Sequence, residues 1–166
     1  MKPYVIAAAC LALTGAAFSA TPKASLYQTG LQDLVDTAMA THRFDTFLTL
    51  LRESDLTFNF KDTGPFTVFM PTDRAFAKMP PGTLQRLRDN RGALRNLLLY
   101  HIVQGSYRAE NAVKHKSIDT LAGPPLPFAI VNGHGMVGNA HFVLTNVATK
   151  NGMLQGIDTV LSPPSD

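Results

Sequence analysis

The chain has 166 residues, of which 45% are hydrophobic and 16% are charged, and its formal net charge at pH 7 is +3. This length and composition fit one globular domain with its own core and leave little room for a second domain. The positive surplus is not gathered into a basic tail or an Arg/Lys-rich run with interleaved aromatic residues, so we expect no nucleic-acid partner.

The N-terminal residues have the pattern of a secretory signal peptide. Lys2 provides a positive charge, and residues 4–17 form an apolar stretch that is too short to span a membrane. A small-x-small site at residues 17–19 predicts cleavage after Ser19, within a few residues, and the alternative is a retained anchor. The single cysteine, Cys10, lies in this segment, so the mature chain would form no disulfide. We therefore expect an exported protein, periplasmic or secreted, with no membrane span in its mature form.

Two amphipathic helices are predicted after a short polar lead at residues 20–29. Apolar residues recur at helical spacing between Leu31 and Met39, and again between Phe44 and Leu51. We expect the apolar faces of both helices to pack in the core.

A buried strand followed by a short helix is predicted next. Residues 66–70 are an aromatic and β-branched run that is apolar at nearly every position. Pro71 cannot donate a ladder hydrogen bond and ends the strand. Thr72 is a suitable N-cap for a helix through Met79, in which Asp73 favours the positive end of the helix dipole.

Two further helices follow the breaker Pro80-Pro81-Gly82. Thr83 is predicted to cap a short one and Asn90 a longer one. In the longer helix, His101 lies at helical spacing from an apolar series, which predicts that it faces the core: Leu94, Leu97 and Leu98.

From Val113 onward the apolar pattern changes to a period of two, with Gly, Pro and Asn at intervals, which indicates a run of hairpins. Helices early and strands late indicate an α+β fold. The candidate inward positions of the hairpins are Phe128, Ile130, Met136, Val137, Phe142, Leu144, Val147, Leu154, Ile157 and Val160.

Three segments resemble the signature motifs of the fasciclin domain family. Residues 67–76, Thr-Val-Phe-Met-Pro-Thr-Asp-Arg-Ala-Phe, resemble its first motif, and residues 97–105 resemble its Tyr-His motif and second signature. Residues 151–161 are similar to its last strand. The resemblance implies a single fasciclin-like domain at residues 30–162, with a flexible tail at 163–166. The implied fold is a compact antiparallel β-wedge or sandwich with several short helices packed along one side.

The resemblance also marks motif residues as structural or partner-binding. In animal members the Tyr-His motif is associated with integrin adhesion, whereas a histidine on an apolar helix face is often a neutral, hydrogen-bonded core residue. Both roles are therefore open for Tyr100 and His101. The motif residues are Thr67, Phe69, Pro71, Thr72, Asp73, Phe76, Tyr100, His101, Asn151, Gly152, Ile157 and Asp158.

The third motif departs from the family at two positions. Gln155 stands where the family usually has histidine, and Gly156 where it has a larger apolar residue. We expect Gln155 to supply the same hydrogen bond, and Asp158 to form a pair inside the fold.

The sequence contains no constellation that indicates an enzyme, and we expect no catalytic activity, cofactor or metal. Residues 133–138 satisfy Gly-x-Gly-x-x-Gly, but no helix follows them as a dinucleotide site requires. His134 and His141 flank a hairpin, and without a third ligand they would make a weak metal site.

The function that the resemblance implies is adhesion or protein binding outside the cytoplasm, with a cell-surface or extracellular protein as partner. The alternative is an envelope protein that binds an acidic polysaccharide or another anion through an Arg-rich helical face. That candidate patch comprises Arg86, Arg88, Arg91 and Arg95, which would otherwise be a solvated surface.

Overall fold

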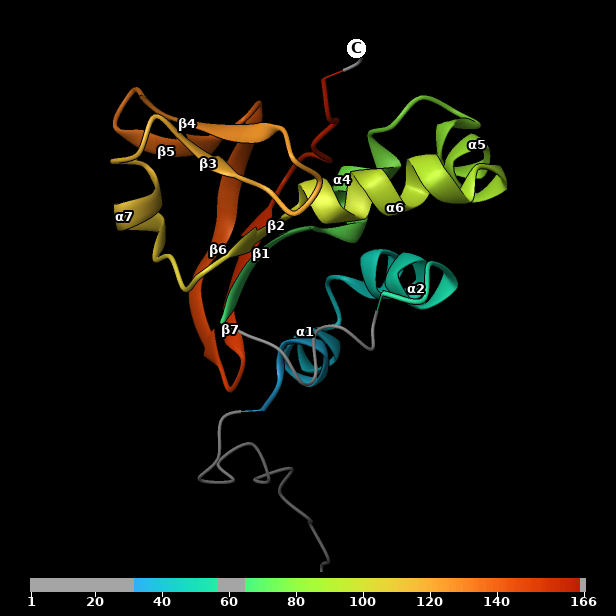
Figure 1. Cartoon of the computed structure of the whole chain (residues 1–166), viewed down its shortest axis with the longest axis horizontal. Helices are drawn as coiled ribbons and strands as arrows, with labels where there is room; N and C mark the ends of the chain where they lie inside the picture. The colour runs from blue at the N-terminus through green and yellow to red at the C-terminus, as the bar shows by residue number, and fades with distance from the viewer. Residues whose placement is uncertain (1–31, 57–64, 165–166) are drawn as a thin grey trace, which may run out of the picture.

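Most helices precede most strands in a computed structural model that describes residues 32–56 and 65–164, although β1 comes before α4 and β2 before α7 (Figure 1). This order confirms the predicted α+β class. The predicted signal peptide and the polar lead at 20–29 lie outside the described residues, as do the last two residues of the predicted tail. The helices are α1 (Leu34–Thr41), α2 (Asp45–Glu53), α4 (Asp73–Ala77), α5 (Thr83–Asp89), α6 (Arg91–Tyr100) and α7 (Ala109–Ala112).

The strands form one seven-stranded sheet in the order β2-β1-β7-β6-β5-β4-β3. Every neighbouring pair is antiparallel except β1 and β7, which run parallel. The Leu121 N–H donates to the Ile102 carbonyl at 2.9 Å, so the two ends of the sheet meet and the wedge is nearly closed. The strands are β1 (Phe66–Pro71), β2 (Ile102–Gln104), β3 (Ser117–Asp119), β4 (Pro125–Val131), β5 (His134–Val137), β6 (Ala140–Thr149) and β7 (Gly152–Ile157).

Strand β1 is buried on both faces, which explains its nearly continuous apolar sequence. Val68 and Met70 belong to a core cluster shared with α1, α2 and α6, whereas Phe69 belongs to a second cluster inside the wedge. Figure 1 shows α1, α2, α4, α5 and α6 gathered on one side of the strands, whereas the short helix α7 lies at the opposite edge, beside β3 and β5. The parallel partner of β1 is β7, the other central strand, so the two signature segments meet at the centre of the fold.

Side chains that begin the helices are largely those expected from the sequence. Thr72 caps α4, and Asn90 caps α6 by accepting from the Ala93 N–H. The predicted cap at Thr83 is wrong, because Thr83 is already the first residue of α5. Gly82 precedes it with φ 78°, a left-handed conformation that glycine tolerates without steric cost.

The late hairpins form as predicted, with one inward position in error. Asn132-Gly133 makes a two-residue turn with positive φ at both residues, between β4 and β5. Ile130 was expected in the core but is 62% exposed. It lies opposite Gly135 in the β4–β5 register, and a glycine offers no side chain to cover it. The other expected inward positions are buried or half-buried.

Candidate functional site

Thr67 and Thr72 attach the two ends of the first motif to the rest of the fold. The buried Thr67 hydroxyl donates to the Gly105 carbonyl and accepts from the Tyr107 N–H, both at 2.8 Å. The Thr72 hydroxyl accepts from the Ala75 N–H at 3.3 Å. Its own backbone N–H donates to the Ile157 carbonyl at 3.0 Å, which joins the first motif to the third.

Asp73 caps helix α2 rather than only its own helix. Its Oδ1 accepts from the Thr46 N–H at 2.8 Å, and its backbone N–H donates to the Arg43 carbonyl at 2.9 Å. Phe44, the residue at the N-cap position of α2, offers no side-chain cap. The carboxylate therefore satisfies a helix that lies earlier in the chain.

The apolar motif residues lie in the core. Phe69 is fully buried, with its ring centroid 5.5 Å from that of Phe128 and 6.2 Å from that of Phe142. Pro71 and Ile157 pair at the end of the β1–β7 ladder, and Phe76 of α4 is also buried. These side chains contribute packing and present no surface to a partner.

His101 is fully buried and uses both ring nitrogens inside the fold. Nδ1 donates to the Leu97 carbonyl at 2.8 Å, and Nε2 accepts from the Leu161 N–H at 3.0 Å. These partners define a neutral imidazole protonated at Nδ1. Burial lowers the pKa of His101 to about 4, against the opposing effect of the Leu97 carbonyl. The backbone carbonyl of His101 also accepts from the Phe69 N–H at 2.8 Å, so this residue joins α6 to β1 and to the C-terminal segment.

Tyr100 is buried beside His101 in the wedge cluster. Its hydroxyl donates to the Pro125 carbonyl at 3.4 Å, which links α6 to strand β4. Burial raises the pKa of the phenol. Neither residue of the Tyr-His pair is therefore exposed for contact with a partner in this conformation.

Asn151 and Gly152 join the third motif to α1 and β1. Asn151 Oδ1 accepts from the Leu34 N–H at 2.8 Å, at the start of α1. A Cβ atom at Gly152 would lie 1.8 Å from the Phe66 carbonyl oxygen, so only glycine fits this approach of the two strands.

Gln155 is fully buried and satisfies three backbone or side-chain groups. Its Oε1 accepts from the Asn146 N–H at 2.9 Å, and its Nε2 donates to the Tyr107 carbonyl at 3.0 Å. A third hydrogen bond joins Nε2 to Asn146 Oδ1 at 3.2 Å. Asn146 has φ 59°, so the amide stabilises a left-handed kink in β6.

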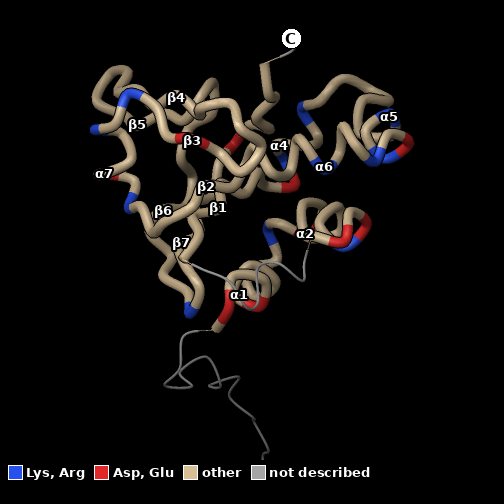
Figure 2. The backbone as a smooth tube through the Cα atoms, in the orientation of Figure 1, with Lys and Arg blue, Asp and Glu red and all other residues tan. Residues whose placement is uncertain are grey.

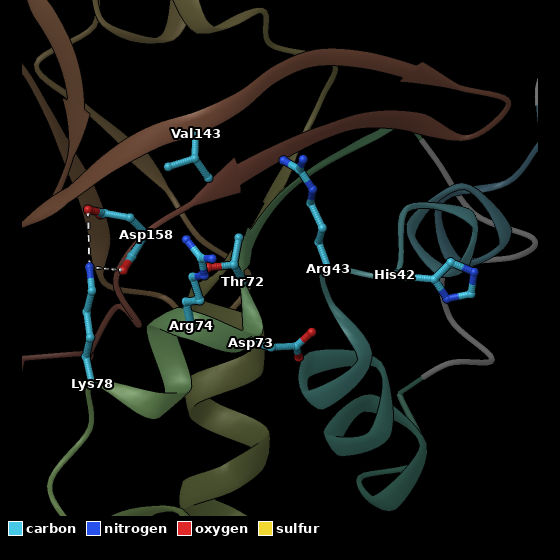
Figure 3. A pocket seen from close by; sticks show the side chains of 8 residues that line it. All are labelled: His42, Arg43, Thr72, Asp73, Arg74, Lys78, Val143 and Asp158. Carbon is cyan, nitrogen blue, oxygen red and sulfur yellow. Dashed lines mark hydrogen bonds and ion pairs between the residues drawn. The ribbon is translucent and has the colours of Figure 1, made fainter.

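A groove of about 630 Å³ brings three motif residues to the surface, and we call it the basic groove (Figure 3). It lies between the segment before α2, helix α4, strand β6 and the residue after β7. The motif residues in it are Thr72, Asp73 and Asp158. The full lining comprises His42, Arg43, Thr72, Asp73, Arg74, Lys78, Val143 and Asp158.

Asp158 forms the internal pair that the sequence suggested. Lys78 Nζ lies 3.5 Å from Asp158 Oδ2 and donates to the Asp158 backbone carbonyl at 3.0 Å. The carboxylate also accepts from the His141 N–H at 2.9 Å and from the Thr159 hydroxyl at 3.0 Å. Burial raises the pKa of Asp158, but these hydrogen bonds and the Lys78 charge outweigh it and hold the pKa below its usual range.

The predicted Arg-rich patch lies on α5 and α6, and its four arginines are exposed to solvent. Figure 2 shows basic positions along both helices, with acidic positions on α5 and α2 nearby. Arg88 Nε lies 3.0 Å from Glu53 Oε2, so part of the positive charge is compensated. Arg91 and Arg95 are one helical turn apart on α6. Anion binding by this patch stays a prediction.

His134 and His141 line a second groove, of about 530 Å³, which we call the hairpin groove. The exposed Ile130 lies in it together with Val113 and Phe142. In residues 32–56 and 65–164, no group of three His, Cys, Asp or Glu residues is arranged to hold a metal ion. Nor does any helix in those residues have the length and apolar content needed to cross a membrane.

A seven-stranded, nearly closed wedge with short helices on one side, organised by these three motifs, defines a fasciclin-type domain. The fasciclin domain family model matches residues 42–163. The chain belongs to this family.

Three bacterial proteins illustrate the similarity in sequence. The uncharacterized protein sll1735 of Synechocystis sp. is 34% identical over 131 residues, covering 79% of this chain and 98% of sll1735. Immunogenic protein MPB70 of Mycobacterium bovis is 38% identical over 107 residues, covering 63% of this chain and 53% of MPB70. Cell surface glycolipoprotein MPB83 of the same species is 34% identical over 139 residues, covering 81% of this chain and 62% of MPB83.

A solved FAS1 domain pair from the insect cell adhesion molecule Fasciclin I shares the fold. Its TM-score is 0.72 at 16% identity, covering 81% of this chain and 52% of that one. The chain therefore spans about half of the insect pair and of MPB70. At this identity the likeness concerns the fold alone.

Proposed function

We propose that this protein is an exported interaction domain that mediates adhesion by binding a cell-surface or extracellular protein, and that it is not an enzyme. Membership of the fasciclin family supports this class of function. Among the relatives, MPB83 is named a cell surface glycolipoprotein, which favours a location outside the cytoplasm. Export itself rests on the signal-peptide pattern of residues 1–19.

The observation that carries the proposal is that the motif side chains are mostly buried, whereas a few apolar side chains outside the motifs are exposed. Most motif side chains are committed to packing or to hydrogen bonds within the fold, so a partner must contact other residues. The large apolar side chains most open to solvent lie on β4 and β6: Ile130 at 62%, Val143 at 47% and Val131 at 44% exposure. An exposed apolar side chain is significant where it stands with other apolar residues, as Ile130 does with Val113 and Phe142 in the hairpin groove.

The hairpin groove is the surface on which we place the protein contact. Ile130 stands in it beside Val113 and the half-buried Phe142, with Glu110 and Lys114 among the lining residues. A groove lined by both apolar and charged side chains suits the apolar anchor of a folded protein partner.

The test compares binding of the purified protein and two variants to envelopes and to secreted proteins of its own cells, at low and high salt. We expect Ile130→Glu to abolish salt-resistant binding, because it buries a charge at the contact. Leu121→Glu changes another exposed apolar residue outside the groove and serves as the matched control. Equal binding by all three proteins would refute the hairpin groove as the contact. Export is tested separately, by cell fractionation of the protein with and without residues 1–19.

The alternative, an acidic polysaccharide bound across Arg86, Arg88, Arg91 and Arg95, predicts the opposite salt response. Binding through exposed charges weakens steeply as salt screens them. Loss of envelope binding at high salt and after charge reversal of these four arginines would favour this alternative. The ion pair between Arg88 and Glu53 leaves fewer uncompensated charges on this face than the sequence suggested.

A further inference from the structure

Two arginines in the basic groove have uncommitted guanidinium groups. Arg43 and Arg74 are both exposed, and neither side chain forms a hydrogen bond or ion pair with the residues that the structure describes. Arg43 rises from the segment before α2 and Arg74 from α4, and both extend toward β6, where Val143 lies (Figure 3). The His42 ring is turned away toward α1. The groove therefore contains two planar guanidinium groups, each with five N–H donors that have no acceptor among the described residues.

The two acidic residues of the groove form no ion pair with these arginines and have other hydrogen-bond partners. Asp73 accepts from the Thr46 N–H at 2.8 Å. Asp158 is held by Lys78, by the His141 N–H and by the Thr159 hydroxyl. An incoming oxyanion would thus meet two guanidinium groups that are not engaged in an ion pair, beside the Lys78–Asp158 pair.

The backbone holds the two arginines in a fixed relation. The Asp73 N–H donates to the carbonyl of Arg43 at 2.9 Å, and Arg74 is the next residue along the chain. The adjacent Thr72 N–H donates to the Ile157 carbonyl at 3.0 Å, which anchors this turn to the central sheet. These backbone hydrogen bonds fix the main chain from which both side chains extend into the same groove.

We propose that the basic groove binds a uronate unit of an acidic polysaccharide, with its carboxylate between Arg43 and Arg74. The forked geometry of guanidinium suits bidentate carboxylate recognition. The groove volume, about 630 Å³, exceeds what a lone carboxylate needs and lies in the range of small-molecule sites. Its lining contains the Thr72 hydroxyl and only one apolar side chain, Val143, so polar and charged groups predominate, which suits a ligand rich in hydroxyl and carboxylate groups.

This inference goes beyond the proposed protein contact, which uses a different groove, so each can fail without the other. The probe is trigalacturonate, titrated calorimetrically into the purified full chain at low salt, with neutral maltotriose as the uncharged control. We expect Arg43→Gln/Arg74→Gln to weaken trigalacturonate binding by at least about tenfold, as loss of charged hydrogen bonds implies. Arg91→Gln/Arg95→Gln removes the same charge from the alternative patch on α6: binding within about twofold of the unaltered protein supports the basic groove, whereas a larger loss than in Arg43→Gln/Arg74→Gln assigns the ligand to that patch and overturns the proposal.

A second variant keeps the test independent of the arginines. Val143→Glu places a negative charge in the groove, which repels the carboxylate of the ligand and should also abolish binding, whereas the uncharged Val143→Ser should not. Equal losses in the two arginine double variants would overturn the proposal in favour of general charge attraction. No binding of trigalacturonate would also overturn it, and so would tighter binding of hexaglutamate, which would assign the groove to an acidic peptide. Urea unfolding of each variant verifies that the fold is intact.

Discussion

The ring of Phe44 occupies the space beside Gly156 that a side chain at this position would need. A Cβ atom there would lie 3.0 Å from Phe44 Cζ and 2.9 Å from Leu144 Cβ. Phe44 is fully buried just before α2, whereas Gly156 lies in the central strand β7. The departure from the family pattern at position 156 thus accompanies a bulky neighbour from the other end of the chain.

We predict that Gly156→Ala destabilises the protein by about 1–3 kcal/mol, the usual cost of overpacking a core. Phe44→Leu removes the ring atoms nearest the new methyl group, so the double variant should be more stable than the sum of the two single changes, by at least about 0.5 kcal/mol. Urea unfolding of all four proteins provides the cycle. Simple additivity would show that the two sites do not share the space.

We predict that Asp73→Ala lowers the free energy of unfolding by about 0.5–2 kcal/mol, because α2 loses its only side-chain cap. Asp73→Asn retains an oxygen that can accept from the Thr46 N–H, so it should retain most of the stability. Chemical unfolding of both variants measures the difference. If alanine and asparagine cost the same, the charge rather than the hydrogen bond would be responsible.

Features set by local sequence could be predicted. The burial of His101 follows from helical spacing, and the caps at Thr72 and Asn90 follow from their side chains. The continuous apolar run of β1 indicated a strand covered on both faces. In each case the sequence signal lies within one turn or one element, although distant segments provide the contacts that cover His101 and β1.

Features set by contacts between distant segments could not be predicted. The Asp73–Thr46 hydrogen bond joins residues separated by 27 positions, and the parallel β1–β7 pairing joins the two signature segments. Arg43 was not singled out at all, because nothing in the sequence indicates that it lies near Arg74. Ile130 has an inward pattern, and only its partner Gly135 leaves it exposed.

We predict that Gly152→Ala costs at least about 3 kcal/mol or prevents folding, at the extreme of single-residue effects. The new Cβ would collide with the backbone oxygen of Phe66, so the β1–β7 ladder would have to separate. Gly92→Ala is the control, because Gly92 is exposed in α6 and alanine should stabilise that helix by about 0.5–1 kcal/mol. Thermal unfolding distinguishes the two, and a mild loss in Gly152→Ala would contradict the close approach.

We predict that His101 makes stability pH-dependent between about pH 6.5 and pH 4. In the folded state the imidazole has a pKa of about 4, whereas in the unfolded chain it has the ordinary value of 6.5, so the unfolded state binds the proton first as pH falls. The contribution of neutral His101 to the free energy of unfolding is fully present above pH 6.5, and about 3 kcal/mol of it is lost by pH 4. His101→Gln should be less stable at pH 7.5 and should lack this slope, because glutamine does not titrate. Exposed His134→Gln should keep the slope, and urea midpoints across the pH range measure all three proteins.

A slope that persists in His101→Gln would assign the pH dependence to other groups, whereas an unchanged stability with lost partner binding would favour a binding role for the Tyr-His pair.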